Sequence, residues 1–158
     1  MRKLITGESE KLQQPNRTTD WLDLESLAKV EITSEDVDHT IESALLQGDE
    51  TGWQASQPGK QTIRLVFDNP QKITRIQLLF EELNQERTQE FVLRWLPEDS
   101  DAHREIVRQQ YNFSPPANTR ELEDFTVNLD GVLILEMIIT PDISGGNARA
   151  SLKRMQLA

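Results

Sequence analysis

The sequence of 158 residues contains no cysteine, only 6% aromatic residues and no long apolar run. Without cysteine there is no disulfide framework, no thiolate nucleophile and no cysteine-ligated metal. No run approaches the roughly 18 apolar residues of a membrane span. The N-terminal stretch holds only the apolar pair Leu4-Ile5, whereas an export signal needs about 7 to 15 apolar residues. We therefore expect a cytoplasmic protein without a membrane span.

Positive charge is scarce in one part of the chain. The formal net charge is −10, and residues 20–50 contain ten acids but a single base, Lys29. A nucleic acid duplex or an anionic membrane would be repelled by such a surface, so we expect no nucleic acid partner. We interpret the segment as a solvated acidic surface that aids solubility. The alternative is a face that docks on a protein partner.

Motifs typical of metal sites, phosphate sites and hydrolases are also missing. His39 and His103 lie far apart without ligand spacing, which argues against zinc. The pair Gly145-Gly146 lacks the spacing of a phosphate-binding loop. Glu81 and Glu82 are adjacent and would point to opposite faces of a strand, so we expect no paired-carboxylate hydrolase. We predict a non-enzymatic protein with no cofactor and no metal ligands.

What the chain does contain is strand periodicity. In residues 62–67 the apolar Ile63, Leu65 and Phe67 share one face, and in residues 75–80 Ile76, Leu78 and Phe80 repeat the alternation. Asp68-Asn69-Pro70 between them favours a tight turn, so we predict a hairpin. The apolar run 132–140 predicts a central strand covered on both faces, or one packed beneath a helix. Many short strands separated by turns predict an all-β sandwich or barrel of antiparallel strands. The other predicted strands are 30–32, 91–95, 103–113, 121–129 and 150–157.

The length of the chain corresponds to one domain. Residues 1–19 are polar and lack periodicity, so we predict a flexible arm followed by a single β-sandwich domain over residues 20–158. After the first strand the pattern predicts a short helix that is capped by Ser34 and ended by Gly48. The apolar stripe of this helix consists of Val37, Ile41, Ala44 and Leu45.

Antiparallel strands place their connections at alternate ends of a sandwich. By this rule the loops 47–60, 81–88, 112–119 and 140–148 share one end, and they include the longest in the chain. Loops on a rigid scaffold commonly carry binding groups, so this end is the candidate site. The candidate ligand-binding residues are Trp53, Arg87, Asn112, Phe113, Asp142, Asn147 and Arg149.

Each candidate has a structural alternative. Trp53 could stack on a sugar ring or anchor its loop to the core. Arg87 could hold hydroxyl groups together with nearby carboxylates, or it could belong to a solvated surface pair. A stiff Ser-Pro-Pro turn would display Asn112 and Phe113 at low entropic cost. The loop 140–148 could bind a hydroxylated ligand, a carboxylate or a cation, or it could be a plain hairpin loop.

The stretch IESALLQGDETGW is followed by a glycine-containing loop and by QTIRLVFDNPQKITRIQLLF. Together these segments resemble the discoidin, or coagulation-factor C-type, domains of the galactose-binding-like fold. Gly48, Thr51 and Trp53 match the loop pattern of that family, and ASLKRMQLA resembles its final strand. The likeness covers about residues 27–158. It implies a jelly-roll sandwich of about eight antiparallel strands that binds ligands at its loop end.

The sequence departs from this family in two ways. Gln47 stands where the loop acid is expected, and the spacing to Thr51 is shorter, which argues against the structural calcium site found in some relatives. The terminal cysteine pair of extracellular members is missing, and intracellular members mostly bind proteins. Two hypotheses follow. The chain is a module that binds a carbohydrate or another small polar ligand, or alternatively an intracellular protein-protein interaction module.

Overall fold

The computed structural model describes residues 20–158, and the predicted arm 1–19 lies outside the described residues. The helices are α1 (Leu24–Leu27) and α2 (Glu42–Leu45). The strands are β2 (Ala28–Ile32), β3 (Trp53–Gln54), β4 (Gln61–Glu81), β5 (Arg87–Pro97), β6 (Arg104–Phe113), β7 (Arg120–Thr140), β8 (Ser151–Leu152) and β9 (Arg154–Leu157). No helix within this range has the length and apolar character needed to cross a membrane.

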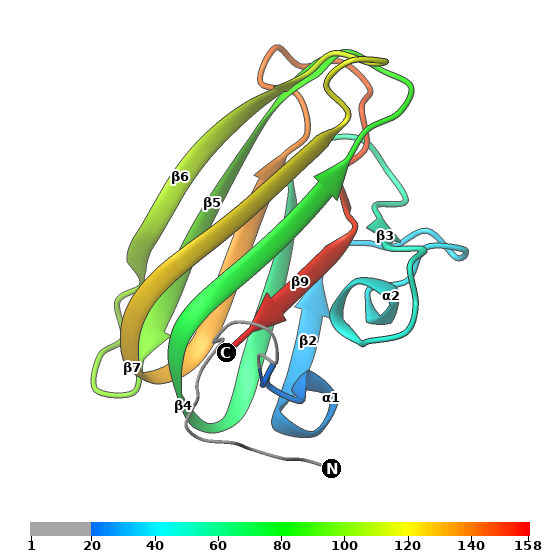
Figure 1. The fold of residues 1–158 in the computed structure, drawn as a ribbon. Helices are drawn as coiled ribbons and strands as arrows, with labels where there is room; N and C mark the ends of the chain where they lie inside the picture. The colour runs from blue at the N-terminus through cyan, green and yellow to red at the C-terminus, as the bar shows by residue number, and fades with distance from the viewer. Residues whose placement is uncertain (1–19) are drawn as a thin grey trace, which may run out of the picture.

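Two long strands, β4 and β7, form the frame of the fold. They pair antiparallel along their whole length, from Gln61 opposite Ile139 to Glu81 opposite Arg120. The register shifts between Val66 and Arg75, and there both strands bend over together at the lower end of the molecule (Figure 1). The two halves of each strand therefore lie in opposite layers.

The remaining strands extend these two layers. One layer contains β2, the first half of β4, the second half of β7, β5 and β6; the other contains β9, the second half of β4 and the first half of β7. Within residues 20–158 this gives layers of five and three strand segments, and β3 pairs with β8 as a separate ribbon. The predicted all-β jelly-roll sandwich of antiparallel strands is confirmed.

The predicted hairpin across Asp68-Asn69-Pro70 is wrong. The chain reverses near these residues, as their turn propensity predicts, but of the described strands each half of β4 pairs with β7 and not with the other half. The reason lies in the apolar faces of the two segments. Leu65 and Phe67 on one half, and Leu78 on the other, are all at most 4% exposed. These faces are buried by packing across the core, which places the segments in opposite layers.

The predicted helix after the first strand is much shorter than expected. Only Glu42–Leu45 is helical, and Ser34 does not cap it, because its hydroxyl donates to Gln61 Oε1 at 2.7 Å. Instead Glu35 Oε1 accepts the backbone N–H of Ile41 at 3.0 Å. Val37, which was assigned to the apolar stripe, is 84% exposed. The apolar residues have helical spacing, but polar side chains accept hydrogen bonds from the backbone N–H groups here. These bonds stabilise an irregular turn in place of the helix.

The predicted central strand is confirmed in the second half of β7. It lies between β4 and β5, and Leu135, Met137 and Ile139 are at most 2% exposed on its inner face. On its outer face Glu136 is buried as well. The cover on that side comes from charged side chains of the neighbouring strands rather than from a helix.

Candidate functional site

Four loops meet at one end of the sandwich, as the alternation of strands predicts. Backbone hydrogen bonds join them: Glu82 N to Thr119 O at 2.8 Å, Ile143 N to Thr88 O at 2.9 Å, and Gly59 N to Ala148 O at 3.4 Å. The loops 81–88, 112–119 and 140–148 lie at the upper end in Figure 1, opposite the bend of β4 and β7, and the loop 47–60 runs up toward them from α2 past β3. These hydrogen bonds hold the loops against one another and so fix the positions of the side chains that the loops carry.

A pocket of about 170 Å³ opens at this end. It is enclosed by β3, by the loop 81–84 and by the segment 149–153. Exposed Leu83 stands at its edge with 61% of its surface accessible. The polar side chains that line the pocket include His39, Gln54, Asn84, Arg149, Ser151 and Lys153.

Several of these polar groups have no partner in the part of the chain that the structure describes. Among residues 20–158, the side chains of Gln54, Asn84 and Arg149 make no hydrogen bond or close ion pair. His39 Nδ1 lies 2.8 Å from Asp36 Oδ2, an interaction that holds the pKa of Asp36 below its ordinary value. The second ring nitrogen of His39 remains available. The pocket can therefore donate and accept several hydrogen bonds to one small ligand.

The loop that carries Asn84 is held in shape by Glu82. Its carboxylate accepts the Nε of Arg87 at 2.7 Å and the backbone N–H groups of Asn84 and Gln85 at 3.0 and 3.2 Å. Burial opposes ionisation of Glu82, but Arg87 and these amides outweigh burial and keep its pKa below the ordinary value. Glu82 thus positions the loop and is not free to react with a ligand.

Trp53 lines the pocket, yet it is only 1% exposed. Its Nε1 donates to the carbonyl oxygen of Ser34 at 3.0 Å. A ring buried to this extent offers no face on which a sugar could stack. The geometry favours the alternative in which Trp53 anchors its loop to the core.

Arg87 and Phe113 lie beneath the loops rather than on them. Arg87 is 2% exposed and Phe113 is fully buried, and the guanidinium lies 4.8 Å from the ring centroid. Arg87 Nη1 also donates to Pro141 O at 2.8 Å. Together with its bond to Glu82, this contact ties two of the loops to the sandwich. Arg87 therefore has a positioning role for the site.

Three other predicted residues lie outside the pocket. Asn112 accepts the hydroxyl of Thr88 at 3.0 Å. Asp142 accepts the hydroxyl and backbone N–H of Ser144 at 2.7 and 3.1 Å, and these bonds lower its pKa. Asn147 is exposed. Of the seven candidates, the structure brings only Trp53 and Arg149 to the pocket.

The structure adds His39, Asn84 and Lys153, which sequence reasoning did not select. The sequence pattern places His39 in the first part of the predicted helix, which is not helical in the structure, so the pattern does not show that His39 lies next to β3. Asn84 lies in the predicted loop 81–88, close in sequence to the candidate Arg87. Lys153 interrupts the pairing of the final segment between β8 and β9. Its only signal in the sequence is that Leu152 differs in strand parity from Met155 and Leu157.

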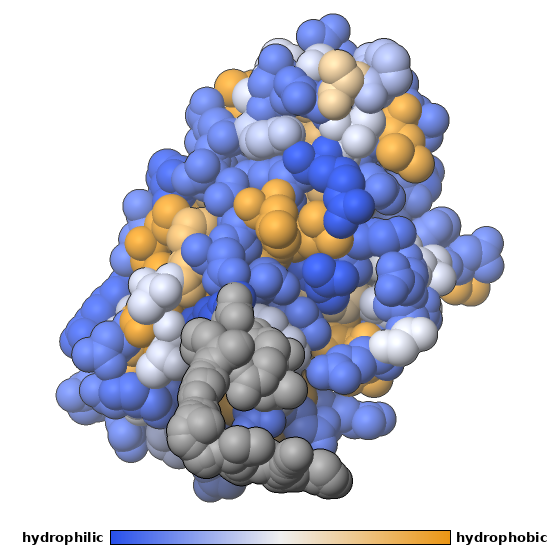
Figure 2. Space-filling model, in the orientation of Figure 1, coloured by the Kyte–Doolittle hydropathy of each residue, from blue (hydrophilic) through white to orange (hydrophobic). Residues whose placement is uncertain are grey.

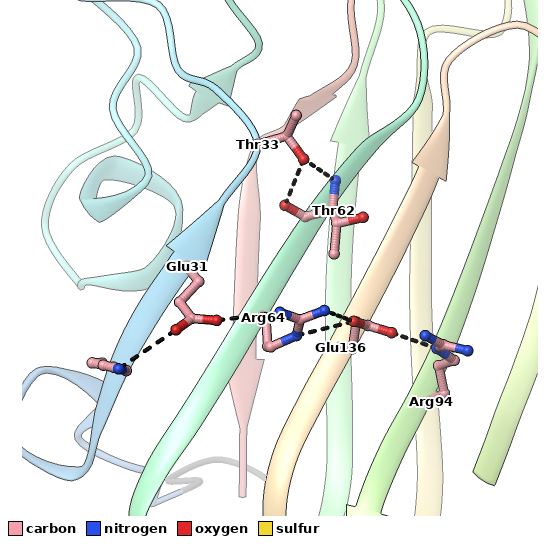
Figure 3. Close-up of polar contacts among 7 residues, drawn as sticks. Glu31, Thr33, Thr62, Arg64, Arg94 and Glu136 are labelled. Atoms are coloured by element: carbon pink, nitrogen blue, oxygen red, sulfur yellow. Dashed lines mark hydrogen bonds and ion pairs between the residues drawn. The ribbon is translucent and has the colours of Figure 1, made fainter. Parts of the chain in front are cut away.

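A row of alternating charges crosses the outer face of the larger layer (Figure 3). Glu136, which is 1% exposed, accepts Arg64 Nε and Nη2 at 3.0 and 2.5 Å, and it also accepts Arg94 Nε. Arg64 Nη1 reaches Glu31 at 3.2 Å. Burial disfavours the charged form of Glu136, but Arg94 and Arg64 prevail and lower its pKa. Because the carboxylate is fully partnered, this row joins β2, β4, β7 and β5 structurally.

The pKa of a second buried acid, Glu121, is shifted in the direction opposite to that of Glu136. Burial, followed by the neighbouring Glu123, raises the pKa of Glu121 to about 9. Its Oε1 accepts Gln89 Nε2 at 3.2 Å, whereas its Oε2 is buried without a hydrogen-bond partner in the described range. The carboxyl group is therefore protonated at neutral pH.

We expect Glu121→Gln to remove a pH dependence of stability. The raised folded pKa means that the wild-type protein is most stable below about pH 4.5 and loses stability as the pH rises toward 9. The variant should match the wild type near pH 5 and exceed it by about 2 to 4 kcal/mol near pH 8. Urea unfolding at both pH values measures this difference. A constant difference at both pH values would show that Glu121 does not titrate in this way.

On the face drawn in Figure 2, residues 20–158 form no single large apolar patch. Figure 2 shows a largely hydrophilic face with separate apolar spots. The most exposed large apolar side chains, Val37, Leu83, Leu122 and Ile143, belong to different elements. A polar ligand fits this surface better than an apolar one.

No known family model matches the sequence, and the search of curated proteins found no similar sequence. Solved structures do match. The family 32 CBM from C. perfringens NanJ in complex with galactose has a TM-score of 0.62 and 14% identity, covering 87% of this chain and 96% of that chain. CBM32 of AlyQ in complex with 4,5-unsaturated mannuronic acid has a TM-score of 0.61 and 15% identity, covering 89% and 98%.

In a third match the solved protein is bound to another protein. A chain in the structure of reduced XRCC1 bound to DNA pol beta catalytic domain has a TM-score of 0.58 and 11% identity, covering 84% of this chain and 96% of that chain. At such identities the matches establish the fold. This chain has the discoidin, or galactose-binding-like, fold that its loop and strand motifs resemble.

Proposed function

We propose that this domain is a non-enzymatic carbohydrate-binding module whose ligand is a single small sugar unit at the loop-end pocket. The observation that carries the proposal is the set of unpartnered side chains, Gln54, Asn84 and Arg149, gathered around one pocket. Amide and guanidinium groups form paired hydrogen bonds with neighbouring hydroxyls or with a carboxylate. At about 170 Å³ the pocket is smaller than a drug-sized site, which favours a small ligand.

The same pocket supports binding rather than hydrolysis. Glycoside hydrolysis needs two available carboxyl groups on either side of the scissile bond. Glu82 is committed to Arg87, and Glu81 lies 3.6 Å from the Lys153 amine. The similarity of the fold to carbohydrate-binding modules supports this view.

We expect Asn84→Ala and Arg149→Ala each to weaken sugar binding by about fivefold to a hundredfold, because a hydrogen bond to a ligand contributes about 1 to 3 kcal/mol. A panel of neutral and acidic sugars is first tested by thermal unfolding. Sugar at 100 times its dissociation constant stabilises by about 2.7 kcal/mol, which moves the midpoint by roughly 5 to 10 °C. Titration calorimetry with the best sugar then compares the variants.

Asn147→Ala and Asn112→Ala are matched controls, since both side chains are exposed at the same end of the molecule but lie outside the pocket. The controls should bind sugar as the wild type does. Equal losses in the pocket variants and in the controls would place the ligand elsewhere on the loops. A panel without any response would count against carbohydrate binding.

A protein-interaction module is the second candidate, and one observation favours it. Nine of the ten acids in residues 20–50 are exposed, all but Asp36. A partner with a basic surface would be attracted to this segment, and its affinity would fall steeply with salt. Weak salt dependence of a purified complex would exclude the acidic segment as the docking face.

A further inference from the structure

The loop that follows α2 is the place where some relatives of this fold hold calcium. It spans residues 46–50 and faces β9, which lies beside α2 (Figure 1). A pocket of about 220 Å³ lies between them. Its lining combines the acids Asp49 and Glu50 with the cations Lys153 and Arg154.

The acid at the centre of this loop is already engaged by the protein. Asp49 Oδ2 accepts the hydroxyl of Ser43 at 2.9 Å, and its Oδ1 accepts the N–H of Thr51 at 2.8 Å. The hydrogen bonds from Thr51 and then from Ser43 lower the pKa of Asp49. Gly48 turns the chain with a φ of 95°. The loop therefore closes through its own hydrogen bonds.

The opposite wall of the pocket is positively charged. Arg154 Nε is buried and has no hydrogen-bond partner among residues 20–158. A buried N–H donor on a guanidinium repels a metal ion and cannot coordinate it. No group of three His, Cys, Asp or Glu side chains in the same range could hold a metal. The residues present do not fit calcium, which needs six to eight oxygen ligands.

We infer that Arg154 takes the place of a metal ion in this domain: the loop after α2 closes through its own hydrogen bonds and is stable without calcium, and the guanidinium lines the same pocket as Asp49 and Glu50. This inference does not depend on the ligand of the loop-end pocket. The residue that excludes the metal, Arg154, is the first residue of β9. The same position, with a carboxylate in place of the guanidinium, would add a third acid to Asp49 and Glu50.

The experiment compares the wild-type chain with Arg154→Glu and with Arg154→Gln. Thermal unfolding is measured in excess calcium chloride and in EDTA, and calcium binding is measured by titration calorimetry. The wild type and Arg154→Gln should show no shift of the midpoint and no heat of binding. Arg154→Glu should unfold at a lower temperature in EDTA and recover several degrees in calcium, because a third acid then lines the pocket together with Asp49 and Glu50 and calcium can neutralise them.

Two outcomes would overturn the inference. Calcium-dependent stabilisation of the wild type would show that the loop binds the metal in spite of Arg154. A folded Arg154→Glu variant without any response to calcium would show that Arg154 is not what excludes the ion. If Arg154→Glu fails to fold, the calcium titrations of the wild type and of Arg154→Gln still decide whether the loop binds calcium.

Discussion

Replacing Trp53 with alanine is expected to lower the free energy of unfolding by about 3 to 5 kcal/mol. The indole ring is 1% exposed, belongs to the core cluster and donates from Nε1 to the carbonyl of Ser34. Its removal would leave a large cavity and an unpaired buried carbonyl. Urea unfolding of the purified variant measures the loss.

A second variant tests whether Trp53 anchors its loop to the core or forms part of the surface that binds the ligand. Trp53→Phe keeps an apolar ring but loses the Nε1 donor, so its loss of stability should be smaller than that of Trp53→Ala. Trp53→Phe, where folded, should keep sugar affinity close to that of the wild type, because its ring still anchors the loop beside Gln54. A stable Trp53→Phe protein with abolished sugar binding would reverse the assignment and make the indole part of the binding surface.

The second large effect concerns the row of charges on the larger layer. The double variant Arg64→Met with Arg94→Met should lose about 3 to 5 kcal/mol at neutral pH, because Glu136 would remain as a buried carboxylate without a cation. Methionine keeps the aliphatic cover over Glu136, so the change isolates the charge. Denaturant unfolding at neutral pH gives the size of the effect.

The pH dependence of this double variant tests the same point. In the wild type the folded pKa of Glu136 is lowered, so the stability from its pairing is present above about pH 4.5 and is lost as the pH falls further. In the double variant burial alone acts and raises this pKa. The difference from the wild type should therefore shrink as the pH falls from about 7 to about 4. An unchanged difference would contradict the proposed role of the two arginines.

A triple variant provides the control for the row. Adding Glu136→Leu to the two methionine substitutions removes the buried charge and leaves an apolar cluster beside Ile134 and Ile138, and buried ion groups replaced in this way commonly cost little. We expect most of the lost stability to return. Failure to recover would mean that the arginines contribute through contacts other than Glu136.

Strand positions could be predicted from the sequence because alternation is a local signal. Leu93 and Trp95 alternate with polar or peripheral side chains in sequence and lie buried on β5 in the structure. The shared end of the four loops followed from counting strands, and it is confirmed by backbone hydrogen bonds between them. Neither inference requires knowing which side chains meet across the core.

The details of the site depend on long-range contacts that no local pattern contains. Arg87 looks like a loop residue in the sequence, but its contacts with Pro141 and Phe113 bury it. His39 was assigned to a helix because Ile41 and Leu45 have helical spacing, yet hydrogen bonds of Glu35 and Asp36 favour a turn there. Asn84 and Arg149 come together only when the two layers are assembled.

The continuous pairing of β4 with β7 has a consequence for how the chain folds. Gln61 pairs with Ile139 and Leu79 pairs with Leu122, so residues far apart in the chain must meet before either layer gains its central strands. Contacts of such long sequence separation slow folding, typically to the range of milliseconds to seconds for β-sandwiches. During synthesis β4 emerges long before its partner, and its apolar face stays exposed until β7 has left the ribosome. Because both layers share this pair of strands, we expect them to form in one cooperative step.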